Sequence, residues 1–184
     1  MNKAKNDLAV APPPREKSKG ATMHKTKNDL SADLRKKMIA LLNLRLADSI
    51  DLKLRAKNAQ WNVKGPHFFA LHELFDKVAA GAEEWSDDLA ERAVQLGGLA
   101  EGLIPSVKER AALGGYSPEI FEGRDLVEVL SSNLAAFGRQ IRRNIDQAAK
   151  AGDQTTADLF TEISRAADKQ LWFVEAHLQG GSSE

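Results

Sequence analysis

Four long stretches of the chain repeat apolar residues every three or four positions, which is the period of an amphipathic helix. Glycine interrupts the pattern between one stretch and the next, at Gly65-Pro66, Gly97-Gly98 and Gly152. No stretch alternates apolar and polar residues as a half-buried strand does. The link between the second and third stretches spans about 25 residues, which is long for a connection inside a compact domain. We therefore predict an all-α chain that folds as a four-helix bundle with one long crossover.

The first stretch, which Ser31 or Asp33 can cap, spaces its apolar residues by a constant four positions: Leu34, Met38, Leu42, Leu46, Ile50 and Leu54. We expect this stripe to face the core. Trp85 and Trp172 lie on or beside the stripes of later helices, and we expect them in the core as well. With the crossover placed between helices two and three, the arrangement is ferritin-like.

The formal net charge of zero conceals two parts of opposite charge. Residues 1–30 hold seven basic and three acidic residues, a net charge of +4, and the rest of the chain holds 19 basic and 23 acidic residues, a net charge of −4. Because residues 1–30 lack apolar periodicity, they cannot offset their ordering entropy by burial. We expect a flexible basic arm over residues 1–30, the bundle over 31–179 and a short tail over 180–184. The basic residues of the arm are Lys3, Lys5, Arg15, Lys17, Lys19, Lys25 and Lys27.

The sequence shows neither a secretory signal nor a membrane span. The longest apolar run of the arm covers only Leu8 to Ala11, and no stretch approaches the roughly 20 apolar residues that cross a bilayer. We expect a cytoplasmic protein without a membrane partner. The chain has no cysteine, which excludes a disulfide scaffold, a thiolate metal site and a cysteine nucleophile.

The second helix carries a candidate metal site. At 100° per residue, His72, Asp76, Asp87 and Glu91 fall within about 100° of the helix circumference. Imidazole with carboxylate suits a divalent ion such as Fe(II), Mn(II) or Zn(II). However, Asp76 and Asp87 are separated by about 16 Å along the axis. One straight helix therefore cannot bring both pairs to one ion.

A two-fold axis that crosses this helix near Gly81 and Ala82 resolves the difficulty. An antiparallel partner helix would bring the first pair of one chain against the second pair of the other, and small residues at the crossing would let the helices approach. The alternative is an ordinary solvated face with a boundary histidine, and Glu83 on the same side illustrates that ambiguity. Glu-x-x-His pairs, which hold two metals inside a single-chain bundle, are absent from the sequence.

Four segments resemble the Dps proteins, miniferritins named for DNA protection during starvation. In chain order they are Gln60-Trp61-Asn62, Leu71-His72-Glu73-Leu74-Phe75-Asp76, Glu91-Arg92-Ala93-Val94-Gln95-Leu96-Gly97-Gly98 and Asp168-Lys169-Gln170-Leu171-Trp172-Phe173. The resemblance covers about residues 31–179. It implies a hollow dodecameric shell, a short extra helix in the crossover, and ferroxidase centres at the two-fold interfaces. There Fe(II) would be oxidised, preferably by hydrogen peroxide, and stored as ferric mineral, which protects against oxidative damage.

Carried over by residue, His72 and Asp76 match ligands from one subunit, and Asp87 and Glu91 match ligands from its partner. These four are the predicted catalytic and metal-binding residues, and Trp61 matches a tryptophan beside the site. Iron is the implied metal, with zinc as an alternative at the same site.

The chain departs from the family at Gln60, where a histidine is usual before the Trp-Asn pair. An amide is a poorer iron ligand than imidazole, so we expect ferroxidation to persist with looser iron binding. The second metal position would then be weaker, water-filled or altered in metal preference. Gln60 remains a candidate ligand. His67 is another, although it stands about 140° round the helix from His72, and the alternative for it is a surface histidine.

Many members of the family bind DNA through lysine-rich extensions, which neutralise phosphates and release counterions. The basic arm is the candidate for this role and for association with the nucleoid, and the alternative is a solubilising tail. The alternative to a ferroxidase is a shell protein that compacts DNA or sequesters metal. Its metal site would be weak or idle because Gln60 replaces the usual histidine.

Overall fold

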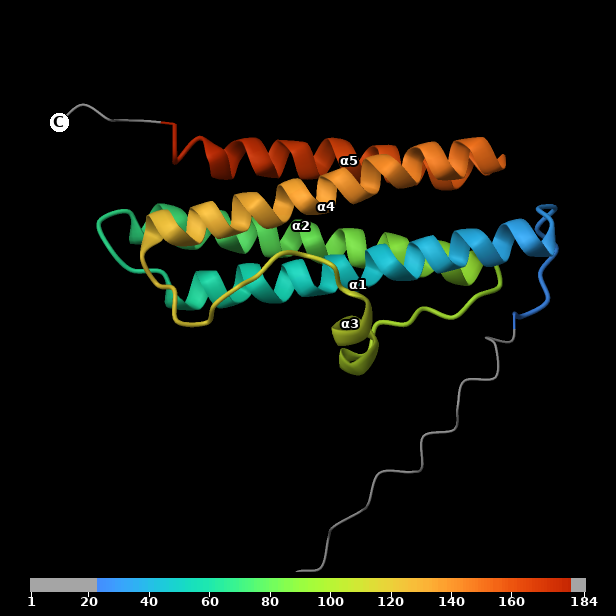
Figure 1. The fold of residues 1–184 in the computed structure, drawn as a ribbon, viewed down its shortest axis with the longest axis horizontal. Coiled ribbons are helices and arrows are strands. Elements are labelled where there is room, and N and C mark those ends of the chain that lie inside the picture. Colours follow the sequence, from blue (N-terminus) through green and yellow to red (C-terminus); the bar gives the residue numbers. More distant parts are fainter. Residues whose placement is uncertain (1–22, 180–184) are drawn as a thin grey trace, which may run out of the picture.

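The computed structural model describes residues 23–179, and over that range the chain forms helices and no β-strand. Two antiparallel hairpins, α1 with α2 and α4 with α5, pack side by side into a four-helix bundle (Figure 1). The all-α, ferritin-like fold with a crossover and a short extra helix is thus confirmed. The helices are α1 (Ala32–Asn62), α2 (Phe68–Gln95), α3 (Ile104–Arg110), α4 (Gly123–Ala151) and α5 (Gln154–Glu175).

The predicted helix ends agree closely with the structure. The Ser31 hydroxyl accepts a hydrogen bond from the Leu34 amide at 3.3 Å and caps α1. The Asp153 carboxylate accepts from the Thr156 amide at 3.0 Å and caps α5. Gly152 ends α4 with a φ of 94°, a left-handed conformation that favours glycine.

The crossover runs from the end of α2 back along the bundle to the start of α4 at the opposite end, and α3 lies within it, against α1 (Figure 1). Polar side chains of α1 hold it in place. The Asp48 carboxylate accepts from the Ala112 amide at 2.7 Å, and the Arg55 guanidinium donates to the Gly114 carbonyl. Because the crossover spans the bundle, α2 and α4 run in the same direction.

The core lies between the two hairpins and is formed by side chains from all four long helices. Its largest fully buried members are Phe75, Phe137 and Phe160. The Trp85 ring stacks on the Phe137 ring at 5.4 Å and is buried as predicted. Trp172, by contrast, is 61% exposed, so the expectation that it lies in the core is wrong.

The predicted stripe of α1 is only half correct. Met38, Leu42 and Leu46 are buried, but Leu54 is 51% exposed. The reason is geometric: a constant spacing of four advances by about 40° per step, so the stripe turns out of the core along the helix. The core positions move instead to Leu52 and later alanines, which leaves the end of the stripe on a second, outward face.

The last residues of the basic arm are attached to the bundle. The His24 amide donates to the Gly97 carbonyl at 2.8 Å. The Arg35 side chain donates to the carbonyls of Leu30 at 3.1 Å and Leu96 at 3.0 Å. A side chain at Gly97 would meet the His24 carbonyl oxygen at 2.6 Å, so glycine is needed there. The arm residues Lys3, Lys5, Arg15, Lys17 and Lys19, and the tail over 180–184, lie outside the described residues.

No helix within residues 23–179 is both long enough and apolar enough to span a bilayer.

Candidate metal centre

The polar face of α2 carries the four predicted ligands as two separate pairs. His72 and Asp76 lie in the first half of the helix, and Asp87 and Glu91 lie in the second half. His72 is half-buried and the three carboxylates are exposed. Across residues 23–179, no three His, Asp or Glu side chains come close enough to hold one metal ion. The two pairs therefore do not form one site within the described part of a single chain.

The imidazole of His72 is held in one tautomer by α1. Its Nδ1 lies 3.0 Å from the backbone carbonyl oxygen of Gln60. Because a carbonyl only accepts hydrogen bonds, Nδ1 carries the proton and donates it. The lone pair is therefore on Nε2, as in histidines that bind metals through this atom while Nδ1 contacts a backbone carbonyl.

The carboxylate of Asp76 is paired with a lysine of α1. Lys57 Nζ lies 2.8 Å from Asp76 Oδ1. The hydrogen bond from Lys57 is the main cause that holds the pKa of Asp76 below its ordinary value. The same ammonium group lies 5.9 Å from the centre of the Trp61 ring, over its face. Lys57 therefore connects a predicted ligand with the tryptophan that the resemblance places beside the site.

Sequence reasoning did not identify Lys57, although a signal for it was present. Lys57 precedes Gln60 by three positions and Trp61 by four, which places all three on one side of α1. A lysine on the same side as a candidate ligand is a natural partner for a carboxylate on the facing helix.

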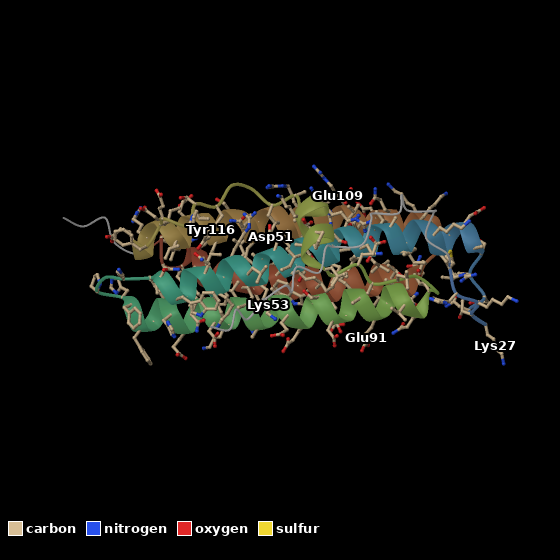
Figure 2. All side chains as sticks on the ribbon, turned by 90° about the horizontal axis from the view of Figure 1, so that it is seen from below. Lys27, Asp51, Lys53, Glu91, Glu109 and Tyr116 are labelled. Carbon is tan, nitrogen blue, oxygen red and sulfur yellow. The ribbon has the colours of Figure 1, made fainter. Side chains whose placement is uncertain are left out.

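The second pair lies in a more negative environment. Burial is the largest cause that raises the pKa of the neighbouring Asp88, followed by the charges of Glu162, Asp87, Glu91 and Glu84. Glu83 forms an ion pair with Lys53 of α1 at 2.7 Å. Glu83 thus forms an ion pair at the surface. Figure 2 labels its partner Lys53, and also Glu91 of the second pair.

His67 occupies the position just before α2 and is exposed. Its side chain makes no hydrogen bond within the described part of the chain. The ring of the next residue, Phe68, packs 5.4 Å from the ring of His72. The structure therefore brings Gln60 to the His72 ring, and it leaves His67 without such a contact.

A groove of about 790 Å³ lies beside the second pair, between α1, α2 and the segment that leads to α3. Its apolar wall includes Ile50, Leu54 and Leu103, and Asp87 contributes to its polar side. Leu103 is 76% exposed and its neighbour Ile104 is 77% exposed. Large apolar side chains gathered around a groove are typical of surfaces that another protein covers.

The two-fold axis near Gly81 and Ala82 stays a prediction, and both positions face the interior of their own chain. Ala82 is fully buried in the core of its own chain. A Cβ atom at Gly81 would lie 3.5 Å from Gln170 of α5, so this position also faces inward. Small residues that lie on the outward face of α2 are Ala80, which is exposed, and Ala90, which is half-buried.

Comparison with known proteins agrees with this architecture. A family model described as a ferritin-like domain matches residues 39–182. The DNA protection during starvation protein of Agrobacterium fabrum is 45% identical over 156 residues, which cover 85% of this chain and 96% of that protein.

Two solved structures are also similar. DpsC from Streptomyces coelicolor is 28% identical with a TM-score of 0.85, covering 92% of this chain and 99% of that one. Dps from Microbacterium arborescens, in a high iron form, is 29% identical with a TM-score of 0.76, covering 84% of this chain and 99% of that one. Fold, family model and sequence identity together show that this chain belongs to the Dps family of ferritin-like proteins.

Proposed function

We propose that this protein is a ferroxidase and iron-storage protein that oxidises Fe(II) at sites shared between two copies of the chain. Each site would combine His72 and Asp76 of one copy with Asp87 and Glu91 of the other. The observation that carries this proposal is the division of four ligand-type side chains into two pairs on one polar face of α2. A two-fold axis between the pairs would generate two identical centres.

The groove beside Asp87 supports the same arrangement. Its exposed apolar wall suits burial against a second copy, and it lies on the face that carries the ligand pairs. Ala80 and Ala90, with their small side chains on that face, would allow the close approach that a shared centre needs. The family's closed dodecameric shell would then store the product as ferric mineral.

The ligands suit the chemistry. One imidazole and three carboxylates form a donor set for Fe(II), with zinc as a competing ion, and the carboxylates stabilise the higher charge of Fe(III). We propose hydrogen peroxide as the preferred oxidant. Two Fe(II) ions give one electron each to one peroxide molecule, which takes up two protons and yields two molecules of water. The Microbacterium arborescens relative was solved in a high iron form, which agrees with iron as the substrate.

The decisive experiment uses two inactive variants, His72→Ala with Asp76→Asn, and Asp87→Asn with Glu91→Gln. Each variant alone would damage both centres of a pair. In a mixed pair, one centre carries all the changes and the other carries none. Random co-assembly should therefore restore about one quarter of the peroxide-dependent Fe(II) oxidation of the wild type, followed by stopped-flow absorbance.

The control for this experiment is Glu128→Gln with Asp146→Asn, two exposed acidic residues on α4, which should retain activity. Co-assembled inactive variants that stay inactive, while each forms an assembly of normal size, would show that the centres are not shared between copies.

DNA binding is a second candidate function. Lys25 and Lys27 are exposed in the part of the arm that leads to the bundle (Figure 2 labels Lys27), and the arm carries a net charge of +4. A multi-subunit shell would present many such arms, and weak contacts with phosphate would add up.

A gel shift at low salt tests this candidate. Its samples are the full chain, a chain that starts at residue 31, and a full chain with the arm's seven basic residues replaced by glutamine. We expect only the first to shift DNA, and the glutamine variant separates charge from length. Equal shifts for all three would remove the arm from DNA binding.

A further inference from the structure

The side chain of Gln60, which lies beside His72, has a buried oxygen without a hydrogen-bond partner among the described residues. Gln60 reaches from α1 toward α2 and is only 7% exposed. Its amide nitrogen lies 3.3 Å from Nε2 of His72. Its amide oxygen Oε1 is buried and has no hydrogen-bond partner among the described residues. Buried carbonyl oxygens without a partner are rare in folded proteins, so we expect this oxygen to have a partner from outside the chain.

The tautomer of His72 explains which end of the amide faces the ring. Since Nδ1 donates to the backbone carbonyl of Gln60, Nε2 is an acceptor, and the amide N–H group is the end that can donate to it. The amide N–H group thus faces the ring nitrogen that would bind an ion.

A cation held by His72 and Asp76 would repel that N–H group. A half-turn about the last side-chain torsion of Gln60 exchanges the amide nitrogen and oxygen without any change in the backbone. The oxygen then faces the ion, and the amide nitrogen takes the position that the oxygen occupied. We propose that Gln60 sets the metal selectivity of the shared site by presenting its side-chain carbonyl as a neutral oxygen ligand. This inference rests on the function proposed above.

The consequence for selectivity follows from ligand chemistry. Imidazole suits Zn(II), whereas carbonyl and carboxylate oxygens suit Mn(II). With Gln60 as a ligand, His72 supplies the only nitrogen donor and every other protein ligand is oxygen. Zn(II) binds more tightly than Mn(II) at most sites, so the quantity to compare is the ratio of the two affinities. That ratio should favour Mn(II), and with it Fe(II), more than in a site with a second imidazole.

Isothermal titration of the full chain with Mn(II) and with Zn(II) tests this inference. The samples are wild type, Gln60→His, which restores an imidazole, and Gln60→Leu, which removes the carbonyl and keeps the bulk. We expect Gln60→His to shift the affinity ratio toward Zn(II) by about tenfold. We expect Gln60→Leu to weaken Mn(II) binding by about tenfold and Zn(II) binding by less.

Two outcomes would overturn the inference: unchanged Mn(II) binding in Gln60→Leu, or an equal change for both ions in Gln60→His. Because the two variants alter the site in opposite ways, either one decides the matter if the other fails to assemble. The Asp87→Asn, Glu91→Gln variant separates this result from the proposed function. If that variant binds Mn(II) as the wild type does, the shared site itself is wrong, whatever Gln60 does.

Discussion

Lys57 would compete with a metal ion for the carboxylate of Asp76, if Asp76 is a ligand as proposed. Its ammonium group donates to that carboxylate at 2.8 Å, at the position where the resemblance places an iron ligand. Both side chains are partly exposed, and exposed pairs of this kind contribute little to folding. The main effect of Lys57 should therefore be on binding of the ion.

We expect Lys57→Met to bind Fe(II) about 2- to 5-fold more tightly than the wild type, because the carboxylate no longer has to release a lysine. Anaerobic titration measures this change. The matched control is Lys36→Met, which removes an exposed lysine of α1 that pairs with Asp33 at 3.9 Å, away from the ligands. Weaker binding by Lys57→Met would mean that the lysine assists the site.

The lowered pKa of Asp76 sets the pH range in which the Fe(II) affinities of Lys57→Met and the wild type should be compared. A carboxyl group with a lowered pKa contributes stability that is complete above its unfolded pKa of about 3.9 and is lost as the pH falls through the lower, folded value. Between about pH 5 and pH 7 the carboxylate is therefore charged with or without Lys57. Any difference in affinity in that range reports competition for the carboxylate.

At the scale of the helices, the sequence predicted most of the fold. The caps at Ser31 and Asp153 and the end of α4 at Gly152 could be located because each depends on a local hydrogen bond or a local backbone conformation. The exposure of Leu54 could have been predicted from the 40° drift of its stripe. The exposure of Trp172 could not, because an apolar residue on a helix does not show whether it faces its own core or a second copy.

The start of α5 is stabilised by a buried network that reaches α2. Arg92 donates to Asp153 at 3.0 Å and to Thr156 at 3.0 Å, and Asp153 also caps the helix. Arg92 directly follows the predicted ligand Glu91 along α2. Packing between α2 and α5 therefore fixes the orientation of the helix turn that carries this ligand.

We expect Asp153→Ala to lower the stability of the chain by about 3 kcal/mol, because it removes a helix cap and leaves a buried arginine unpaired. The thermal midpoint should fall by roughly 6–12 °C, measured at one protein concentration since assembly also affects it. Asp153→Asn, which keeps a capping oxygen, should lose less. Equal losses for the two variants would assign the effect to the arginine pair alone.

At the scale of the whole molecule, the exposed end of the α1 stripe favours association. Leu54 is 51% exposed and lines the groove beside Asp87. A substitution there should leave the single chain folded, because the side chain is not part of the core.

Leu54→Asp should place an unpaired carboxylate in the contact between two copies, at a cost of about 3 kcal/mol, close to a 100-fold loss of pairing affinity. We expect smaller species by light scattering, unchanged helical content and loss of Fe(II) oxidation. Leu54→Met keeps the apolar contact and should assemble normally. If Leu54→Asp still forms an assembly of full size, the contact between two copies lies on another face.

The pairing of Lys57 with Asp76 also bears on the order of events in the cell. If two copies meet through shared centres, each meeting brings Asp76 close to two further carboxylates, and the lysine already offsets part of that negative charge. The proposed shell could therefore assemble before any iron is available. Each iron ion that binds later would displace the Lys57 ammonium group from Asp76, so iron uptake would exchange one cation for another.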